Sequence, residues 1–230
     1  MKKRLYILFT TLFLSCLSAF IYSQTPDFTN RIVIDIWAEL DAYPESEEAK
    51  DTEAEPFDYS INRIKTVSEF LINGMVYGWN FYYTPSDKLR TVKEYFETEP
   101  INTVDYTQNP IVYKKPLVIE NKLHSWAEYL RTDQQKWTFS QWNSIQTKKG
   151  QGRGAGKLSS GFDGIIEATN NAIIDGIRKY YRGIIKNKPK EIDGKLIISA
   201  APRIGIIEGQ YIVELDFFLE TDRIIKYTQF

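Results

Sequence analysis

Apolar residues at helical spacing predict two amphipathic helices, each followed by residues with the pattern of strands. The first helix begins near Ser60 and ends at Gly74. The second gives the clearest periodicity in the chain: it begins after Ser160, keeps one apolar face over residues 162–184 and is stopped by Pro189. Its last turns are basic, which complements the negative end of the helix dipole.

Alternation of large apolar residues with other residues predicts strands in several places. Residues 32–40 form one apolar strand candidate, and residues 75–83 form an aromatic one that ends before Pro85. A turn at Glu208 and Gly209 indicates a hairpin. The remaining strands are expected at 117–120 and, as the two arms of this hairpin, at 196–207 and 210–220.

Two segments carry competing patterns. Residues 89–96 suit a short helix better than a strand. Thr132 and Gln135 have the spacing of a capping box, which favours a helix through Trp137 and Trp142. The aromatic residues from Trp137 onward also alternate as in a strand, so the second segment stays open between the two structures.

The order of these elements predicts an α+β fold. A helix precedes an aromatic strand over residues 60–84, and a helix precedes a hairpin over residues 160–220. We expect a single domain over residues 24–230, with two helices packed on mainly antiparallel strands and a long helix followed by a β-hairpin at the end.

Residues 1–23 have the anatomy of a cleavable secretory signal peptide. Three basic residues at positions 2–4 precede an uncharged run over 5–22, and the best cleavage point follows Ser23. Lipoprotein processing at Cys16 and an uncleaved anchor are the alternatives. The protein is therefore expected to be periplasmic or secreted, with membrane contact only through the signal peptide or a lipidated Cys16.

Cleavage would change the composition in two ways. It removes Cys16, the single cysteine, so that the mature chain has neither a disulfide nor a thiol. It also lowers Lys plus Arg from 29 to 26 against 30 Asp plus Glu, for a net charge of −4. A mildly acidic chain lacks the basic footprint that phosphate backbones require, so nucleic acid is not an expected partner.

The acidic segment 41–56 is expected to be a mobile, solvated loop. It carries seven acidic residues against Lys50 alone and has few apolar residues. A calcium loop over residues 51–56 would need a glycine and a closing glutamate, which are missing. The chain has one histidine, His124, and no metal site is expected.

Four alternating glycines lie among lysines and an arginine in residues 147–159, just before the long helix. We expect a flexible, basic, Gly-rich loop, with contact to an anion or polyanion as the alternative. A phosphate-binding Walker loop would need glycine at Gln151 and Ser or Thr at Leu158. An exported protein also meets little dinucleotide, so no cofactor is expected.

Glycoside hydrolysis needs two facing carboxyl groups. Acidic residues in or near the expected strands could supply such a pair, so a secreted glycoside hydrolase is a further alternative. Alternating charge on an exposed strand face explains them equally well, and no nucleophile motif surrounds His124. We therefore expect no catalytic residue and no enzyme. The carboxylates in question are Asp35, Glu39, Glu128, Glu214 and Asp216.

Three tryptophans between residues 126 and 142 are the main binding candidates. Exposed on one face, they would stack on sugar rings or on a protein partner. The basic residues of the segment 147–159 would add charge. The candidate binding residues are Trp126, Trp137, Trp142, Lys148, Lys149 and Arg153.

Residues 70–88 (FLINGMVYGWNFYYTPSDK) and 92–97 (VKEYFE) resemble a segment of the FlaA-type outer-layer (sheath) proteins of spirochaete periplasmic flagella. The resemblance covers about 30 residues without a chemical motif, so it carries over no site residue. It implies a structural protein that coats a filament and contacts like subunits or the core flagellin.

The first functional expectation is thus a non-enzymatic structural or assembly protein of the periplasm, with a flagellar filament sheath component as the form that the resemblance implies. Its partner would be another protein or a second copy of the chain. The alternative is a periplasmic module that binds a carbohydrate or an envelope polymer through the tryptophans and the basic segment.

Overall fold

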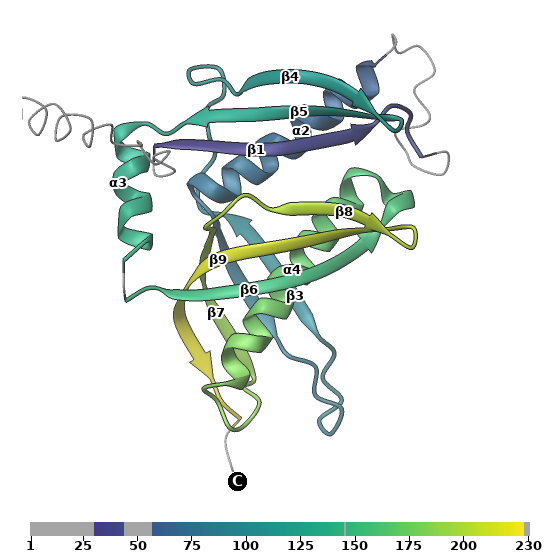
Figure 1. Ribbon diagram of the computed structural model, residues 1–230. Helices are drawn as coiled ribbons and strands as arrows, with labels where there is room; N and C mark the ends of the chain where they lie inside the picture. Colours follow the sequence, from purple (N-terminus) through teal and green to yellow (C-terminus); the bar gives the residue numbers. More distant parts are fainter. Residues whose placement is uncertain (1–29, 44–56, 145, 228–230) are drawn as a thin grey trace, which may run out of the picture.

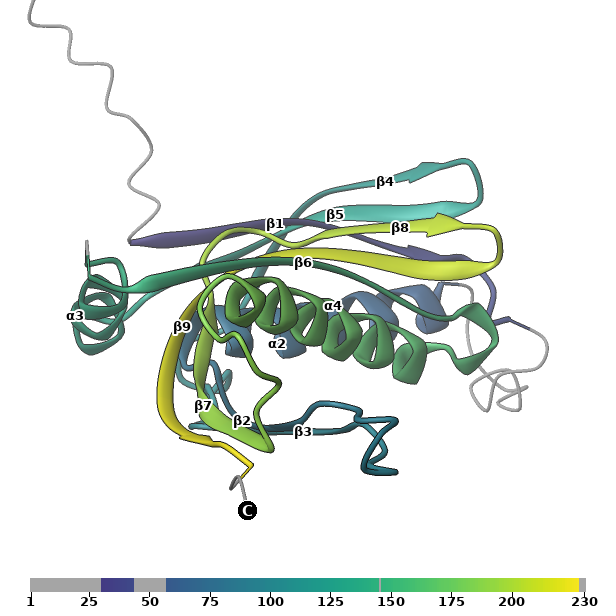
Figure 2. The same cartoon turned by 90° about the horizontal axis from the view of Figure 1, so that it is seen from below.

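In the computed structural model of the protein, two long helices lie between two layers of strands (Figures 1 and 2). The structure describes residues 30–43, 57–144 and 146–227. The helices are α2 (Asp58–Val76) and α4 (Phe162–Arg182), as the apolar spacing predicts. The strands pair antiparallel, and the predicted α+β fold with a single domain is confirmed.

The upper layer of Figure 2 combines a three-stranded sheet with half of a six-stranded one. The three-stranded sheet has the order β1-β5-β4, and Trp37 Nε1 on β1 donates a hydrogen bond to the Ile204 carbonyl on β8, 3.2 Å away. Helix α2 packs against β1 and β5, and α4 packs against β6 and β9. The strands are β1 (Arg31–Glu39), β4 (Val112–Ile119), β5 (Lys122–Leu130), β6 (Lys148–Lys157) and β8 (Arg203–Ile207).

Strand β9 (Gln210–Ile225) joins the two layers, because its first part pairs with β6 and β8 and its last part pairs with β7. It curves around the helices into the lower layer of strands (Figure 2). There the sheet continues in the order β7-β2-β3. These strands are β7 (Glu191–Ile198), β2 (Trp79–Thr84) and β3 (Tyr95–Pro100).

The expected Gly-rich basic loop 147–159 is wrong: residues 148–157 are strand β6, followed by a 3-10 turn, η3 (Leu158–Ser160). From Gly150 to Gly156 every second position of β6 is a buried glycine, and the last three of these glycines face the backbone of α4. A Cβ at Gly152 would lie 1.8 Å from the Ala172 carbonyl oxygen, and one at Gly154 would lie 2.1 Å from that of Ala168. The glycines therefore bring a strand into direct contact with the backbone of a helix.

Two further sequence predictions need correction. The short helix expected over residues 89–96 is absent from the structure, which has an isolated bridge between Asp87 and Val92 and then β3. The expected hairpin arm 196–207 is divided into β7 and β8, and only β8 forms the hairpin with β9. A hydrophobic pattern does not reveal which half of a long strand each partner takes.

The segment after Thr132, for which the sequence left helix and strand open, is a helix, α3 (Asp133–Trp142). Its expected capping box is present. The Gln135 backbone N–H donates to Thr132 Oγ1 at 3.3 Å, and the Thr132 N–H donates to Gln135 Oε1 at 3.0 Å. Gln135 is buried, and Oε1 also accepts from the Tyr129 hydroxyl on β5. The cap thus orients α3 against β5.

We expect Thr132→Ala to lower the free energy of unfolding by about 1 kcal/mol, because an N-terminal N–H of α3 loses its acceptor. Chemical denaturation measures the change. Ser140→Ala, at an exposed position within the same helix, is the control and is expected to change stability by less than ~0.5 kcal/mol. Equal losses in the two variants would contradict the role assigned to the cap.

A polar cluster joins the lower strands to α4. The Tyr83 hydroxyl on β2 donates to Glu94 Oε1 at 2.8 Å and accepts from Arg178 Nε at 2.9 Å, and Arg178 also pairs with Glu94. Burial raises the pKa of Tyr83 to about 12, since it disfavours the charged phenolate.

This pKa makes stability depend on alkaline pH. The folded state holds the Tyr83 proton more tightly than the unfolded state, whose pKa is near 10, so its contribution is complete below pH ~10 and is lost as the pH rises towards ~12. Denaturation between pH 8 and pH 12 is expected to show a smaller loss of stability in Tyr83→Phe. An unchanged loss in this variant would show that another group is responsible.

Several sequence predictions fall on residues that the structure does not describe. The signal peptide 1–23 and Cys16 are among them, as is most of the acidic segment 41–56. Among the described residues, no helix is long and apolar enough to cross a membrane.

Candidate functional site

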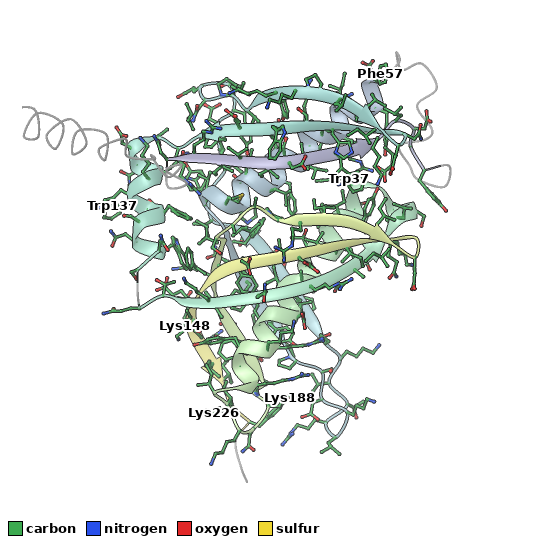
Figure 3. The ribbon with its side chains drawn as sticks, viewed as in Figure 1. Trp37, Phe57, Trp137, Lys148, Lys188 and Lys226 are labelled. Atoms are coloured by element: carbon green, nitrogen blue, oxygen red, sulfur yellow. The ribbon has the colours of Figure 1, made fainter. Side chains whose placement is uncertain are left out.

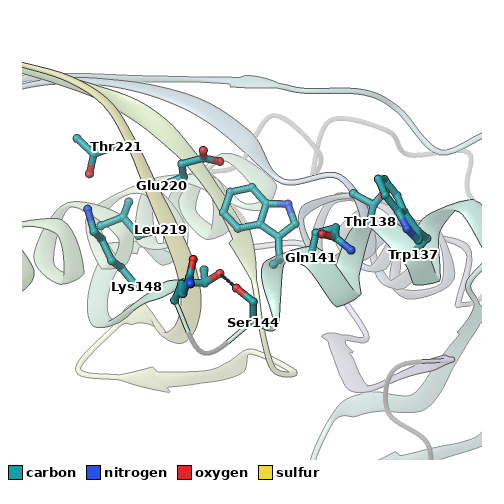
Figure 4. Close-up of a pocket in the computed structure, with 11 residues that line it drawn as sticks. Trp137, Thr138, Gln141, Ser144, Lys148, Leu219, Glu220 and Thr221 are labelled. Carbon is teal, nitrogen blue, oxygen red and sulfur yellow. Dashed lines mark hydrogen bonds between the residues drawn. The ribbon is translucent and has the colours of Figure 1, made fainter.

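A groove of about 490 Å³ opens between α3, the start of β6 and the point where β9 curves away (Figure 4). Trp137, Thr138 and Gln141 lie on its α3 side, with Lys148 and Glu220 towards the sheet. The residues that complete the lining are Trp142, Ser144, Gln146, Thr147, Leu219 and Thr221.

The groove results from unequal strand lengths. Strand β6 begins at Lys148, opposite Leu219, whereas β9 runs on to Ile225 beside β7 alone. Glu220 and Thr221 therefore lie past the start of β6, where α3 and its connection occupy the side of β9. Since loops and strand ends tolerate varied side chains, this is a place where a fold can carry a binding site.

The two tryptophans of the groove have different environments. Trp137 is 61% exposed, on the outer side of α3 (Figure 3), whereas Trp142 is half-buried against the apolar cluster of Phe139, Ile197 and Phe218. Residues five positions apart on a helix are about 140° apart around its axis, so the two indoles extend from different sides of α3. Trp137 is free to contact a ligand, and Trp142 forms part of the groove's wall.

The rest of the lining is mainly polar and uncharged. Side-chain amides and hydroxyls come from both sides, and Ser144 Oγ lies 2.9 Å from Thr147 Oγ1. Glu220 and Lys148 add one charge of each sign, and the Lys148 ammonium lies 5.9 Å from the centre of the Tyr180 ring. Exposed indole faces beside amide and hydroxyl groups match the alternating apolar faces and hydroxyl edges of sugar rings.

Three of the six candidate binding residues, Trp137, Trp142 and Lys148, line this groove. The other three lie elsewhere. Trp126, 43% exposed, is on β5, opposite Asp35 of β1. The Lys149 ammonium lies 5.6 Å from the centre of the Phe218 ring, and Arg153 lies 3.8 Å from Glu214.

The carboxylates considered for hydrolysis do not line the groove, and two of them form ion pairs with basic residues. Glu128 pairs with Arg31 at 3.0 Å and with Lys114 at 2.7 Å. Glu214 pairs with Arg203 at 2.8 Å. Charge pairing across the strands, as expected for a solvated sheet face, accounts for these two acids.

No group of three or more His, Cys, Asp or Glu side chains suited to a metal ion occurs within the described ranges. His124 lies on β5 opposite Trp37 of β1 and Leu117 of β4.

Sequence reasoning missed most polar residues of the groove. Ser144, Gln146 and Thr147 follow a capped helix and precede a strand, and their composition is a usable signal for a polar connection. Glu220 and Thr221 carry no such signal, because only the pairing of β6 with β9 places them beside α3.

The fold and the groove define an α+β protein with antiparallel sheets around two helices and an open site at a sheet edge. A protein-family model matches residues 19–227, and the chain belongs to that family. An uncharacterized protein of Treponema pallidum (strain Nichols) is 30% identical over 199 residues, which cover 86% of this chain and 82% of the relative. No solved structure matches the chain.

Proposed function

We propose that the protein is an exported, non-enzymatic module of the cell envelope that holds a glycan in the groove between α3 and β6. The observation that supports it most is the exposure of Trp137 at a groove lined with amides and hydroxyls. An indole that is 61% exposed leaves its face available for stacking on a sugar ring. Binding, rather than a reaction, is the activity of this site.

Sedimentation with purified cell-wall sacculi tests the proposal. The purified protein is expected to pellet with sacculi and to be released by soluble glycan strands prepared from them. Intrinsic tryptophan fluorescence should shift on addition of the same strands, because Trp137 changes its solvent contact. Protein that stays in the supernatant and keeps its fluorescence spectrum would overturn the glycan-binding function.

A structural or assembly role is the second candidate, and one surface favours it. Leu117, Val118 and Ile119 are consecutive exposed apolar residues at the end of β4, an edge strand of the three-stranded sheet. The register of β4 shifts at Lys115 and Pro116, just before these residues. This irregularity disfavours pairing of another strand with the middle of β4 and leaves the end of β4 available for contact with a partner.

Co-purification separates the two candidates. A sheath component is expected to be recovered with periplasmic filaments, and Leu117→Asp with Ile119→Asp should release it from them. If filaments isolated from cells lack the protein, the sheath role fails while the glycan-binding groove stands.

A further inference from the structure

A second cavity lies at the C-terminal end of α4, on the side of β2 and β7. It has a volume of about 560 Å³ and lies between the last turns of α4, the connection to β7 and the residues that follow β2. Its apolar wall comes from side chains of these three segments and of β7. They are Pro85, Ile177, Ile185, Pro189 and Ile192. The size is that of a small-ligand site.

The charged lining of this cavity is predominantly cationic. Arg178, Arg182, Lys186 and Lys188 line it together with one carboxylate, Glu94. Arg178 pairs with Glu94, and the Lys188 ammonium donates to the Ser86 carbonyl, an uncharged acceptor. After the one acid is matched, three cations remain around one opening.

The negative end of the α4 dipole does not account for this charge. The helix ends at Arg182, and its last turn already carries Lys179 and Arg182. Lys186 and Lys188 lie beyond the helix, in the connection to β7. A dipole acts over about one turn, so it does not account for these two lysines.

The local charge also contrasts with the chain as a whole. The protein has a formal net charge of −1, whereas residues 182–190 contain four basic and no acidic residues. Figure 3 shows Lys188 and Lys226 at this same end of the molecule. Ile184, in the same connection, is 58% exposed. A cationic opening with an apolar wall selects an anion attached to an apolar group.

We propose that this cavity binds a phosphate ester, with the phosphate at Arg182, Lys186 and Lys188 and the organic part against the isoleucine and proline wall. Three cations suit a phosphate better than a singly charged carboxylate, because arginine and lysine make charge-assisted hydrogen bonds to several phosphate oxygens. A soluble phosphate ester and the headgroup of an anionic lipid share this chemistry.

Calorimetric titration of the full protein with phenyl phosphate, and flotation with vesicles of phosphatidylglycerol and phosphatidylcholine, test the proposal. Arg182→Gln with Lys186→Gln is expected to weaken binding about tenfold or more. Both side chains are exposed, so this variant should fold. Ser86→Trp, which fills the opening and removes no charge, should block binding as well.

Lys179→Gln with Lys190→Gln is the matched control, since it removes the same charge from the same end of the protein outside the cavity. It is expected to weaken binding less than about threefold. Variant-sensitive binding to the vesicles would identify a lipid headgroup, and such binding to phenyl phosphate alone would identify a soluble ester. Absence of binding to both probes would overturn the proposal, as would equal losses in the two double variants or unchanged binding in Ser86→Trp.

Discussion

Replacing Gly152 by alanine is expected to lower the free energy of unfolding by about 3 kcal/mol or more, although it adds a single methyl group. The new Cβ would lie 1.8 Å from the Ala172 carbonyl oxygen and 2.7 Å from the Gly176 nitrogen. Both are backbone atoms of α4, so no side chain can rotate away. Either β6 moves off the helix or the interface between them opens.

Gly205→Ala is the control, because a Cβ at this position on β8 meets no atom within 4 Å. It is expected to leave stability unchanged or to raise it by up to ~1 kcal/mol, since alanine has less conformational freedom to lose than glycine. Urea denaturation of both variants measures the difference. A Gly152→Ala protein as stable as Gly205→Ala would contradict the close packing of β6 on α4.

The alternating glycines show why strand β6 was not predicted from the sequence. Glycine is depleted in strands, so four of them among basic residues indicate a loop by composition alone. Their spacing of two residues instead indicates a strand, in which all four glycines face the same side and leave that side without side chains. The helix that needs this space was predicted correctly, but nothing local shows that it lies on the glycines.

Replacing Trp137 by alanine is expected to weaken glycan binding about tenfold, equivalent to ~1.4 kcal/mol, because the stacking surface is lost. Stability should change little, since the side chain is 61% exposed. Fluorescence titration with soluble glycan strands measures the affinity, and thermal unfolding checks the fold.

Trp126→Ala is the matched control for this prediction. Trp126 is an exposed tryptophan from the same part of the sequence, yet it lies on β5 and does not line the groove. Its replacement is expected to leave the affinity within about twofold of the original protein, since no groove atom is removed. Equal losses in the two variants would show that the protein binds glycans through exposed aromatic surface in general.

Part of the candidate site could be predicted from the sequence, because some of its residues lie in one local stretch of the chain. The capping box at Thr132 places Trp137 and Trp142 on a helix. These two residues are near Lys148 in the sequence, and all three line the same groove. Trp126 looks equivalent in the sequence, but the antiparallel pairing of β5 with β1 turns it towards a different face. The pairing of strands that are far apart in the sequence decides such differences, and local sequence patterns do not reveal this pairing.

The most direct test of the central claim is a nuclear magnetic resonance titration that follows the indole N–H signals of the five tryptophans. With soluble glycan strands, the signals of Trp137 and Trp142 are expected to shift together and to saturate with a single affinity. The signals of Trp79, which is buried in the core, and Trp126 should stay in place. Shifts at Trp126 without shifts at Trp137 and Trp142 would contradict a glycan site between α3 and β6.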